Sequence, residues 1–164
     1  MNRPVCAVAG GSSCSREEYA AAREAGRLLA RAGFVVVTGG LGGVMEASSR
    51  GAREGGGLVL GLLPGTDAAD ANPFVEVAIP TGLGDARNAV VAAAGSVVIA
   101  VGGSLGTLSE VALALKRGTP VIGLGTWSLD PSRLPPGGGV REASSPAEAV
   151  RMAVEILEGR KAAR

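Results

Sequence analysis

The chain contains no histidine, and this absence narrows the chemistry open to it. A Ser–His–Asp triad, a Cys–His pair and a histidine-ligated metal are all excluded. The only cysteines, Cys6 and Cys14, are too few for a zinc cage or a disulfide framework. We therefore expect no metal held by the protein itself. Cys14 falls in a predicted loop, where it is either a reactive thiol or simply a small side chain.

Aromatic residues and blocks of charge are also scarce. One Trp, one Tyr and two Phe do not provide the stacking platform that single-stranded nucleic acid needs. The net charge is +1, and arginines are spread along the predicted helices without a basic block, so we expect no nucleic-acid partner. No apolar run reaches the roughly 18–20 residues of a membrane helix. The stretch "MNRPVCAVAGGSS" lacks the apolar core of a secretory signal, so we expect a cytoplasmic protein without a membrane partner.

What the sequence does contain is an alternation of short apolar runs and helical patterns. Strands are predicted over 5–10, 34–40, 58–65, 96–103 and 120–125, with shorter ones over 74–80 and 140–143. Helices are predicted over 15–33, 43–56, 84–95, 105–118 and 145–159. Continuous apolar strands indicate burial on both faces. The pattern predicts a doubly wound, mainly parallel α/β sheet with helices on both faces, in a single domain spanning 1–164.

Three glycine-rich loops follow predicted strands. They are "AGGSSCS" (9–15), "TGGLGGVME" (38–46) and "VGGSLGTLSE" (101–110). Ligands of such sheets bind beyond the carboxyl ends of the strands, where bare loops let an anion reach amides at a helix N-terminus. One such loop is often only a tight turn, but three at one edge favour a phosphate site. Neither the P-loop pattern nor a conventional dinucleotide fingerprint is present.

Several polar side chains stand at these loops. Ser12, Ser13, Ser104 and Thr107 offer hydroxyls to phosphate oxygens, or else cap helices. Arg87 begins a predicted helix and offers a two-pronged guanidinium, or else is a solvated surface residue. Glu110 is unexpected among these polar residues, because a carboxylate beside a phosphate-binding loop repels the phosphate. We therefore expect Glu110 to contact something else, such as a ribose hydroxyl, an attacking water or Arg87.

The segments "TGGLGGVMEA", "ARNAVV" and "VGGSLGTLSE" resemble the LOG-like, or lysine-decarboxylase-like, family of Rossmann-related proteins. The resemblance covers about 4–159 and implies a modified Rossmann fold and a homo-oligomer, dimer or tetramer. In the family's nucleoside monophosphate hydrolases the last motif begins with proline, and an Arg–Lys pair precedes it. Here Val101 and Asn88 replace that proline and lysine, which looks more like the branch that contains molybdenum cofactor carrier proteins.

The loops and the resemblance together define one candidate binding site. Its residues are Gly11, Ser12, Ser13, Gly39, Gly40, Gly43, Met45, Arg87, Asn88, Gly102, Gly103, Ser104, Gly106, Thr107 and Glu110. In the first hypothesis the site holds a phosphorylated small molecule, by resemblance the molybdenum cofactor (molybdopterin), which brings its own metal. In the second, the chain is a nucleoside 5′-monophosphate phosphoribohydrolase, for which Arg87 and Glu110 match the family's catalytic residues.

Some features are left open by the sequence. A DNA-binding relative is a third hypothesis, against which the neutral charge and scarce aromatics argue. The alanine-rich stretches 89–94 and 112–115 allow close helix packing, either between subunits or on the chain's own sheet. Trp127 and the loop 128–139 either border the ligand or cover a sheet edge.

Overall fold

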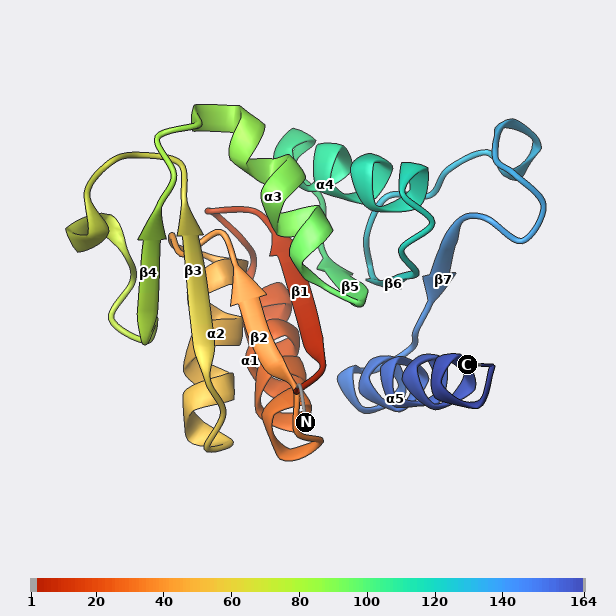
Figure 1. The fold of residues 1–164 in the computed structure, drawn as a ribbon, viewed down its shortest axis with the longest axis horizontal. Coiled ribbons are helices and arrows are strands. Elements are labelled where there is room, and N and C mark those ends of the chain that lie inside the picture. Colours follow the sequence, from red (N-terminus) through yellow and green to blue (C-terminus); the bar gives the residue numbers. More distant parts are fainter. Residues whose placement is uncertain (1–2, 164) are drawn as a thin grey trace.

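A seven-stranded, fully parallel sheet forms the centre of the computed structural model, which describes residues 3–163 (Figure 1). The strand order is β4-β3-β2-β1-β5-β6-β7, and every neighbouring pair is parallel. The strands are β1 (Val5–Gly10), β2 (Val35–Thr38), β3 (Val59–Leu63), β4 (Val77–Pro80), β5 (Val97–Val101), β6 (Val121–Leu124) and β7 (Val140–Glu142). The predicted doubly wound α/β fold is confirmed.

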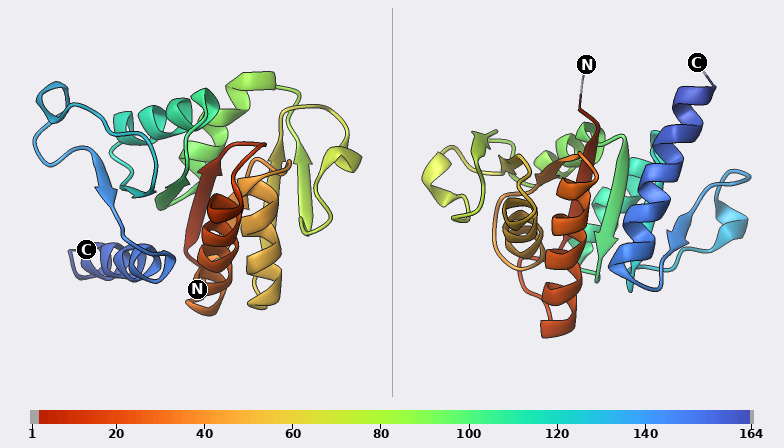
Figure 2. Two further views of the ribbon diagram at one scale, coloured as in Figure 1. Left: turned by 180° about the vertical axis from the view of Figure 1, so that it is seen from behind. Right: turned by 90° about the horizontal axis from the view of Figure 1, so that it is seen from below.

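Helices cover both faces of this sheet (Figure 2). They are α1 (Arg16–Arg31), α2 (Val44–Glu54), α3 (Arg87–Ala94), α4 (Leu105–Lys116) and α5 (Pro146–Ala162), with short 3-10 turns at Ala68–Asp70, Gly84–Ala86 and Pro131–Arg133. Helices α1, α2 and α5 pack on one face, whereas α3 and α4 pack on the other. The chain builds outward from β1 to β4 and then returns to place β5 on the other side of β1. Strand order therefore reverses between β1 and β5, which is where such sheets bind ligands.

Most predicted boundaries differ from the structure by one or two residues, and three differ by three residues. The strand predicted over 74–80 begins only at Val77, because Asn72 closes a turn by accepting hydrogen bonds from the amides of Phe74 and Val75. The helix predicted over 84–95 starts with a 3-10 turn and becomes α-helical at Arg87. The helix predicted to stop at Gly159 runs on to Ala162. Gly159 has no positive φ, so it does not act as a helix stop.

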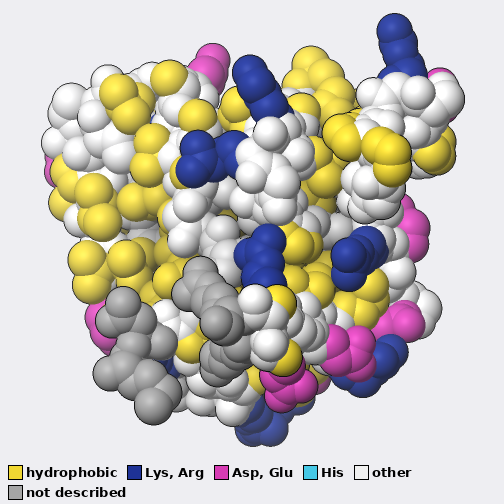
Figure 3. All heavy atoms as spheres, turned by 45° about the vertical axis from the view of Figure 1, so that its right-hand side comes forward, with side chains coloured by type: hydrophobic (Ala, Val, Ile, Leu, Met, Phe, Trp, Pro, Cys, Tyr) yellow, Lys and Arg dark blue, Asp and Glu magenta, His cyan; other side chains and the backbone are white. Residues whose placement is uncertain are grey.

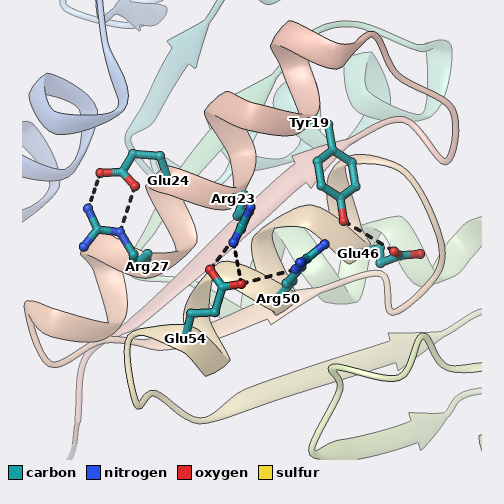
Figure 4. A network of polar contacts seen from close by, with 7 residues as sticks. All are labelled: Tyr19, Arg23, Glu24, Arg27, Glu46, Arg50 and Glu54. Atoms are coloured by element: carbon teal, nitrogen blue, oxygen red, sulfur yellow. Dashed lines mark hydrogen bonds and ion pairs between the residues drawn. The ribbon is translucent and has the colours of Figure 1, made fainter.

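Helices α1 and α2 are in direct backbone contact. A Cβ atom on Gly51 would collide with the carbonyl oxygen of Arg23, so only glycine allows this approach. Between the two helices, the Arg23 guanidinium of α1 donates two hydrogen bonds to Glu54 of α2, at 2.9 and 2.7 Å (Figure 4). Arg50, on α2 itself, donates to the same carboxylate. These contacts fix the two helices relative to each other. The loops that enter them, after β1 and β2, are thereby fixed as well.

The molecular surface carries mixed charge. Lys and Arg side chains are spread over the face drawn in Figure 3 rather than gathered in one block. Among residues 3–163, no helix combines the length and the apolar character needed to cross a membrane.

Candidate functional site

A cleft of about 170 Å³ lies beyond the carboxyl ends of β1 and β5. It is lined by Gly10, Ser12, Leu41, Met45, Asp85, Arg87, Asn88, Ser104, Gly106, Thr107 and Glu110. All three glycine-rich loops and the start of α3 therefore contribute to one site, as the shared sheet edge predicts. A larger cavity of about 280 Å³ lies at the opposite edge of the sheet, beside the loop 134–139, and contains none of the candidate residues.

Eight of the fifteen candidate residues line this cleft, and seven do not. The eight are Ser12, Met45, Arg87, Asn88, Ser104, Gly106, Thr107 and Glu110. Gly10, Leu41 and Asp85 also line it, although the sequence did not single them out. Asp85 carried a signal that was overlooked, since it lies only two residues before Arg87, in the turn that enters α3. Leu41 carried no such signal, because it is an apolar side chain in a loop whose glycines suggested the site.

The glycines of the first two loops pack these loops against each other. Gly43 has φ of 60°, and a Cβ atom there would collide with the carbonyl oxygen of Gly11. That oxygen accepts a hydrogen bond from the amide of Val44, at 3.0 Å. The carbonyl of Gly40 accepts a hydrogen bond from the amide of Asn72. These glycines shape the walls of the cleft without lining it, and the exposed Ser13 also lies outside the lining.

Gly102 and Gly103 face away from the cleft lining. Gly102 has φ of 63°, and a Cβ atom there would collide with the Glu18 carboxylate of α1. A Cβ atom on Gly103 would lie 2.9 Å from Nε1 of Trp127. Both glycines therefore let neighbouring side chains approach the β5–α4 loop from outside the cleft.

Ser104 and Thr107 cap α4 and line the cleft at the same time. The Ser104 hydroxyl accepts from the Thr107 amide at 3.2 Å, and the Thr107 hydroxyl accepts from the Ser104 amide at 3.3 Å. This reciprocal pair leaves the amides of Leu105 and Gly106 without a hydrogen-bond partner in the part of the chain that the structure describes. Two unpaired amides at a helix N-terminus form a binding point for an anion.

Arg87 is buried, with 7% of its surface exposed, and one part of its guanidinium is already bonded. Nη1 donates to the carbonyl oxygens of Gly39 and Leu62, at the ends of β2 and β3. Nε is buried and has no partner among the described residues. Burial lowers the pKa of Arg87, while the negative charges of Glu110 and Asp85 oppose this effect. A buried guanidinium N–H without a partner carries a desolvation cost. Because Nε has almost no exposed surface, a ligand in the cleft reaches it only if Arg87 moves.

Glu110 is buried to a similar degree, with 6% exposed, and lines the same cleft. Among the described amides and side chains, none donates a hydrogen bond to its carboxylate. Burial raises the pKa of Glu110 to about 7, and the charge of Arg87 only partly offsets this rise. Near neutral pH a large fraction of Glu110 is therefore protonated. In that form it does not repel a phosphate and can donate a hydrogen bond.

The cleft contains no ready-made metal cage. In the part of the chain that the structure describes, no three or more His, Cys, Asp or Glu side chains come together in a way that could hold a metal ion. Asn88 donates from Nδ2 to the Ser109 hydroxyl at 2.9 Å, which joins α3 to α4 at the rim of the cleft. The chemistry offered by the protein is thus hydrogen bonding and charge, directed at an oxygen-rich anion.

The sequence and the fold of this chain are both similar to those of known proteins. The model of the SLOG cluster4 family matches residues 3–150. The structure of the molybdenum cofactor binding protein from Rippkaea orientalis is 40% identical, with a TM-score of 0.88 over 96% of this chain and 99% of that one. The molybdenum cofactor carrier protein from Chlamydomonas reinhardtii is 34% identical, with a TM-score of 0.83 over the same shares. An uncharacterized protein from Archaeoglobus fulgidus is 44% identical over 117 residues, which are 71% of this chain and 77% of that protein.

Proposed function

The chain belongs to the SLOG cluster4 family, and from this premise we propose that it is a cytoplasmic carrier of the molybdenum cofactor. Its membership agrees with the LOG-like resemblance seen in the sequence. The observation that carries the proposal is one cleft lined both by the N-terminus of α4, where the Gly106 amide has no partner among the described residues, and by the cationic side chain of Arg87. The names of the two solved relatives, which state cofactor binding and carriage, support the choice of ligand.

The residues of the cleft suit a phosphorylated pterin. The phosphate would bind at the amides of Leu105 and Gly106, where the helix dipole of α4 favours negative charge. Arg87 would supply a charged donor, because its position is fixed by the two sheet carbonyls rather than by the ligand. The molybdenum would belong to the cargo, since neither His nor Cys lines the cleft. Protonated Glu110 would donate to a ligand oxygen.

The rest of the ligand needs more room than the cleft alone provides. Through Asp85, Asn88 and Gly106 the cleft continues into a groove of about 360 Å³ between α3 and α4. The two cavities together reach the size of ordinary small-molecule sites. The pterin would extend along this groove, beside Ala89 and Leu113.

Binding of the cofactor can be tested directly. The protein is mixed under anaerobic conditions with molybdenum cofactor released from a molybdoenzyme, and bound molybdenum is measured by mass spectrometry after gel filtration. We expect binding at micromolar concentration, and at least tenfold weaker binding for Arg87→Met. The matched control is Arg133→Met, since Arg133 is exposed and remote from the cleft lining. If the wild-type protein retains no molybdenum, the carrier proposal is wrong.

Hydrolysis of a nucleoside 5′-monophosphate is the less favoured function. Its one supporting observation is that Arg87 and Glu110 are buried in the same cleft. Incubation with AMP and with isopentenyladenosine monophosphate tests it. Release of free base by the wild type, lost in Glu110→Ala, would establish the hydrolase in place of the carrier.

We also propose that the chain is a single domain that forms a homo-oligomer through the outer face of α3 and α4. Leu105 is 76% exposed and Val90 is 37% exposed, and the small side chains of Ala89, Ala93 and Ala112 on the same two helices are exposed as well. A second copy packed there would cover the rim of the groove. Light scattering should give a dimer or tetramer for the wild type, and a monomer for Leu105→Glu.

The single domain is tested on that monomeric variant. One cooperative urea transition would support a single domain.

A further inference from the structure

Trp127, the only tryptophan of the chain, contacts the β5–α4 loop from the loop that follows β6. Its indole Nε1 donates a hydrogen bond to the carbonyl oxygen of Ser104, at 3.0 Å. The same oxygen accepts the first α-helical bond of α4, from the Leu108 amide at 3.0 Å. The Ser104 peptide is therefore held by its own helix and by a side chain distant in sequence.

Gly103 makes this contact possible. A Cβ atom there would lie 2.9 Å from Nε1 and 3.2 Å from Cδ1 of Trp127, so a larger residue would displace the indole. Gly103 does not have a positive φ, so its backbone does not itself require glycine. A second link joins the same loop to the end of β6, where the Gly102 amide donates to the Leu124 carbonyl at 3.1 Å.

We propose that Trp127 is a positioning residue for the ligand-binding loop. It fixes the Ser104 peptide and thereby the direction of the unpaired amides of Leu105 and Gly106, which follow directly. Trp127 does not line the cleft, so it acts through the loop and not by touching the ligand. This inference rests on the proposed function as far as the ligand is concerned, but its structural part can be measured without any ligand.

The first experiment measures backbone amide hydrogen exchange of residues 103–108 in the ligand-free protein. Trp127→Phe removes the donor, whereas Gly103→Ala keeps the tryptophan but displaces its indole from the Ser104 carbonyl. Losing one hydrogen bond of ordinary strength should accelerate exchange about fivefold in each variant. Because both substitutions break the same contact, the double variant should exchange no faster than either single one.

The matched control is Arg160→Met. Arg160 also donates to backbone carbonyls, those of Ser96 and Gly118, but at the opposite edge of the sheet. It should leave exchange at 103–108 unchanged. Wild-type exchange in Trp127→Phe, or fully additive effects in the double variant, would overturn the positioning role whether or not the protein binds a ligand.

The second experiment separates the positioning role from general stability. The wild-type protein and Trp127→Phe are titrated with released molybdenum cofactor and with AMP. We expect severalfold weaker binding by the variant, a ligand-free melting temperature lowered by no more than about 2–4 °C, and a change of wild-type indole fluorescence on binding. Equal affinity of both proteins would overturn the proposal. If the wild type binds neither probe, the carrier function fails, and the exchange data alone decide whether Trp127 positions the loop.

Discussion

Arg87 donates from Nη1 to the carbonyl oxygen of Gly39, and this approach depends on Gly39 having no side chain. A Cβ atom on Gly39 would lie 2.5 Å from Nη1 and 2.5 Å from Sδ of Met45. Gly39 therefore determines where the guanidinium of the cleft can lie, even though it does not line the cleft itself.

Gly39→Ala is expected to move Arg87 and to weaken ligand binding. Overpacking of this kind costs about 1–3 kcal/mol of unfolding free energy, which urea denaturation measures. Gly159→Ala is the control, because its Cβ would meet nothing within 4 Å, and Gly159 lies inside α5. Gly159→Ala should leave the unfolding free energy unchanged or raise it by about 0.5–1 kcal/mol. Equal stability of the two variants would contradict this account.

Glu110 is expected to make the protein less stable as pH rises. Its pKa is about 7 in the folded state and near 4.5 when unfolded, so between these values the folded protein binds the extra proton. Its contribution is fully present below pH 4.5 and lost as pH rises through 7, by up to about 3 kcal/mol. Urea unfolding between pH 5 and 8 should show this slope in the wild type and a flatter one in Glu110→Gln. If the unfolding free energies of the two proteins change in parallel with pH, Glu110 is not the cause of the pH dependence.

Gly43 should be far less tolerant of substitution than another glycine with positive φ. Gly43→Ala adds backbone strain of about 1–2 kcal/mol and a collision with Gly11 and Ser12. Gly56 has φ of 77°, but its Cβ would meet nothing within 4 Å, so Gly56→Ala carries the strain alone. The difference between their unfolding free energies isolates the packing of the two loops. Ligand affinity should fall only in Gly43→Ala.

Ser104→Ala should reduce both stability and ligand binding. Loss of an N-cap costs about 1 kcal/mol. Ser145 offers a matched control, since its hydroxyl accepts from the Glu148 amide at the start of α5. Ser145→Ala should cost similar stability, measured by thermal unfolding, but leave binding unchanged because Ser145 does not line the cleft. A Ser104→Ala variant that binds like the wild type would show that the cap has no part in the site.

Much of the fold could be predicted because its signals are local. The run 97–101 is wholly apolar and is buried throughout as β5. The boundary errors at 74–76 and 159 arose where a turn or a helix end depends on partners beyond the local sequence. For the site, Arg87 and Glu110 were predicted from their place beside the glycine loops. The roles of Gly102 and Trp127 could not be predicted, since each depends on a contact between distant segments.

The sequence by itself determined the alternation of strands and helices, the edge at which the glycine-rich loops collect, and the absence of histidine chemistry. These follow from local hydrophobicity, backbone preference and composition. Only the tertiary structure decided that Gly43 packs on Gly11, that Arg87 Nη1 is bonded while Nε has no partner among the described residues, and that burial raises the pKa of Glu110 to about 7. Packing and desolvation depend on what surrounds a side chain in space, and no pattern along the chain encodes that directly.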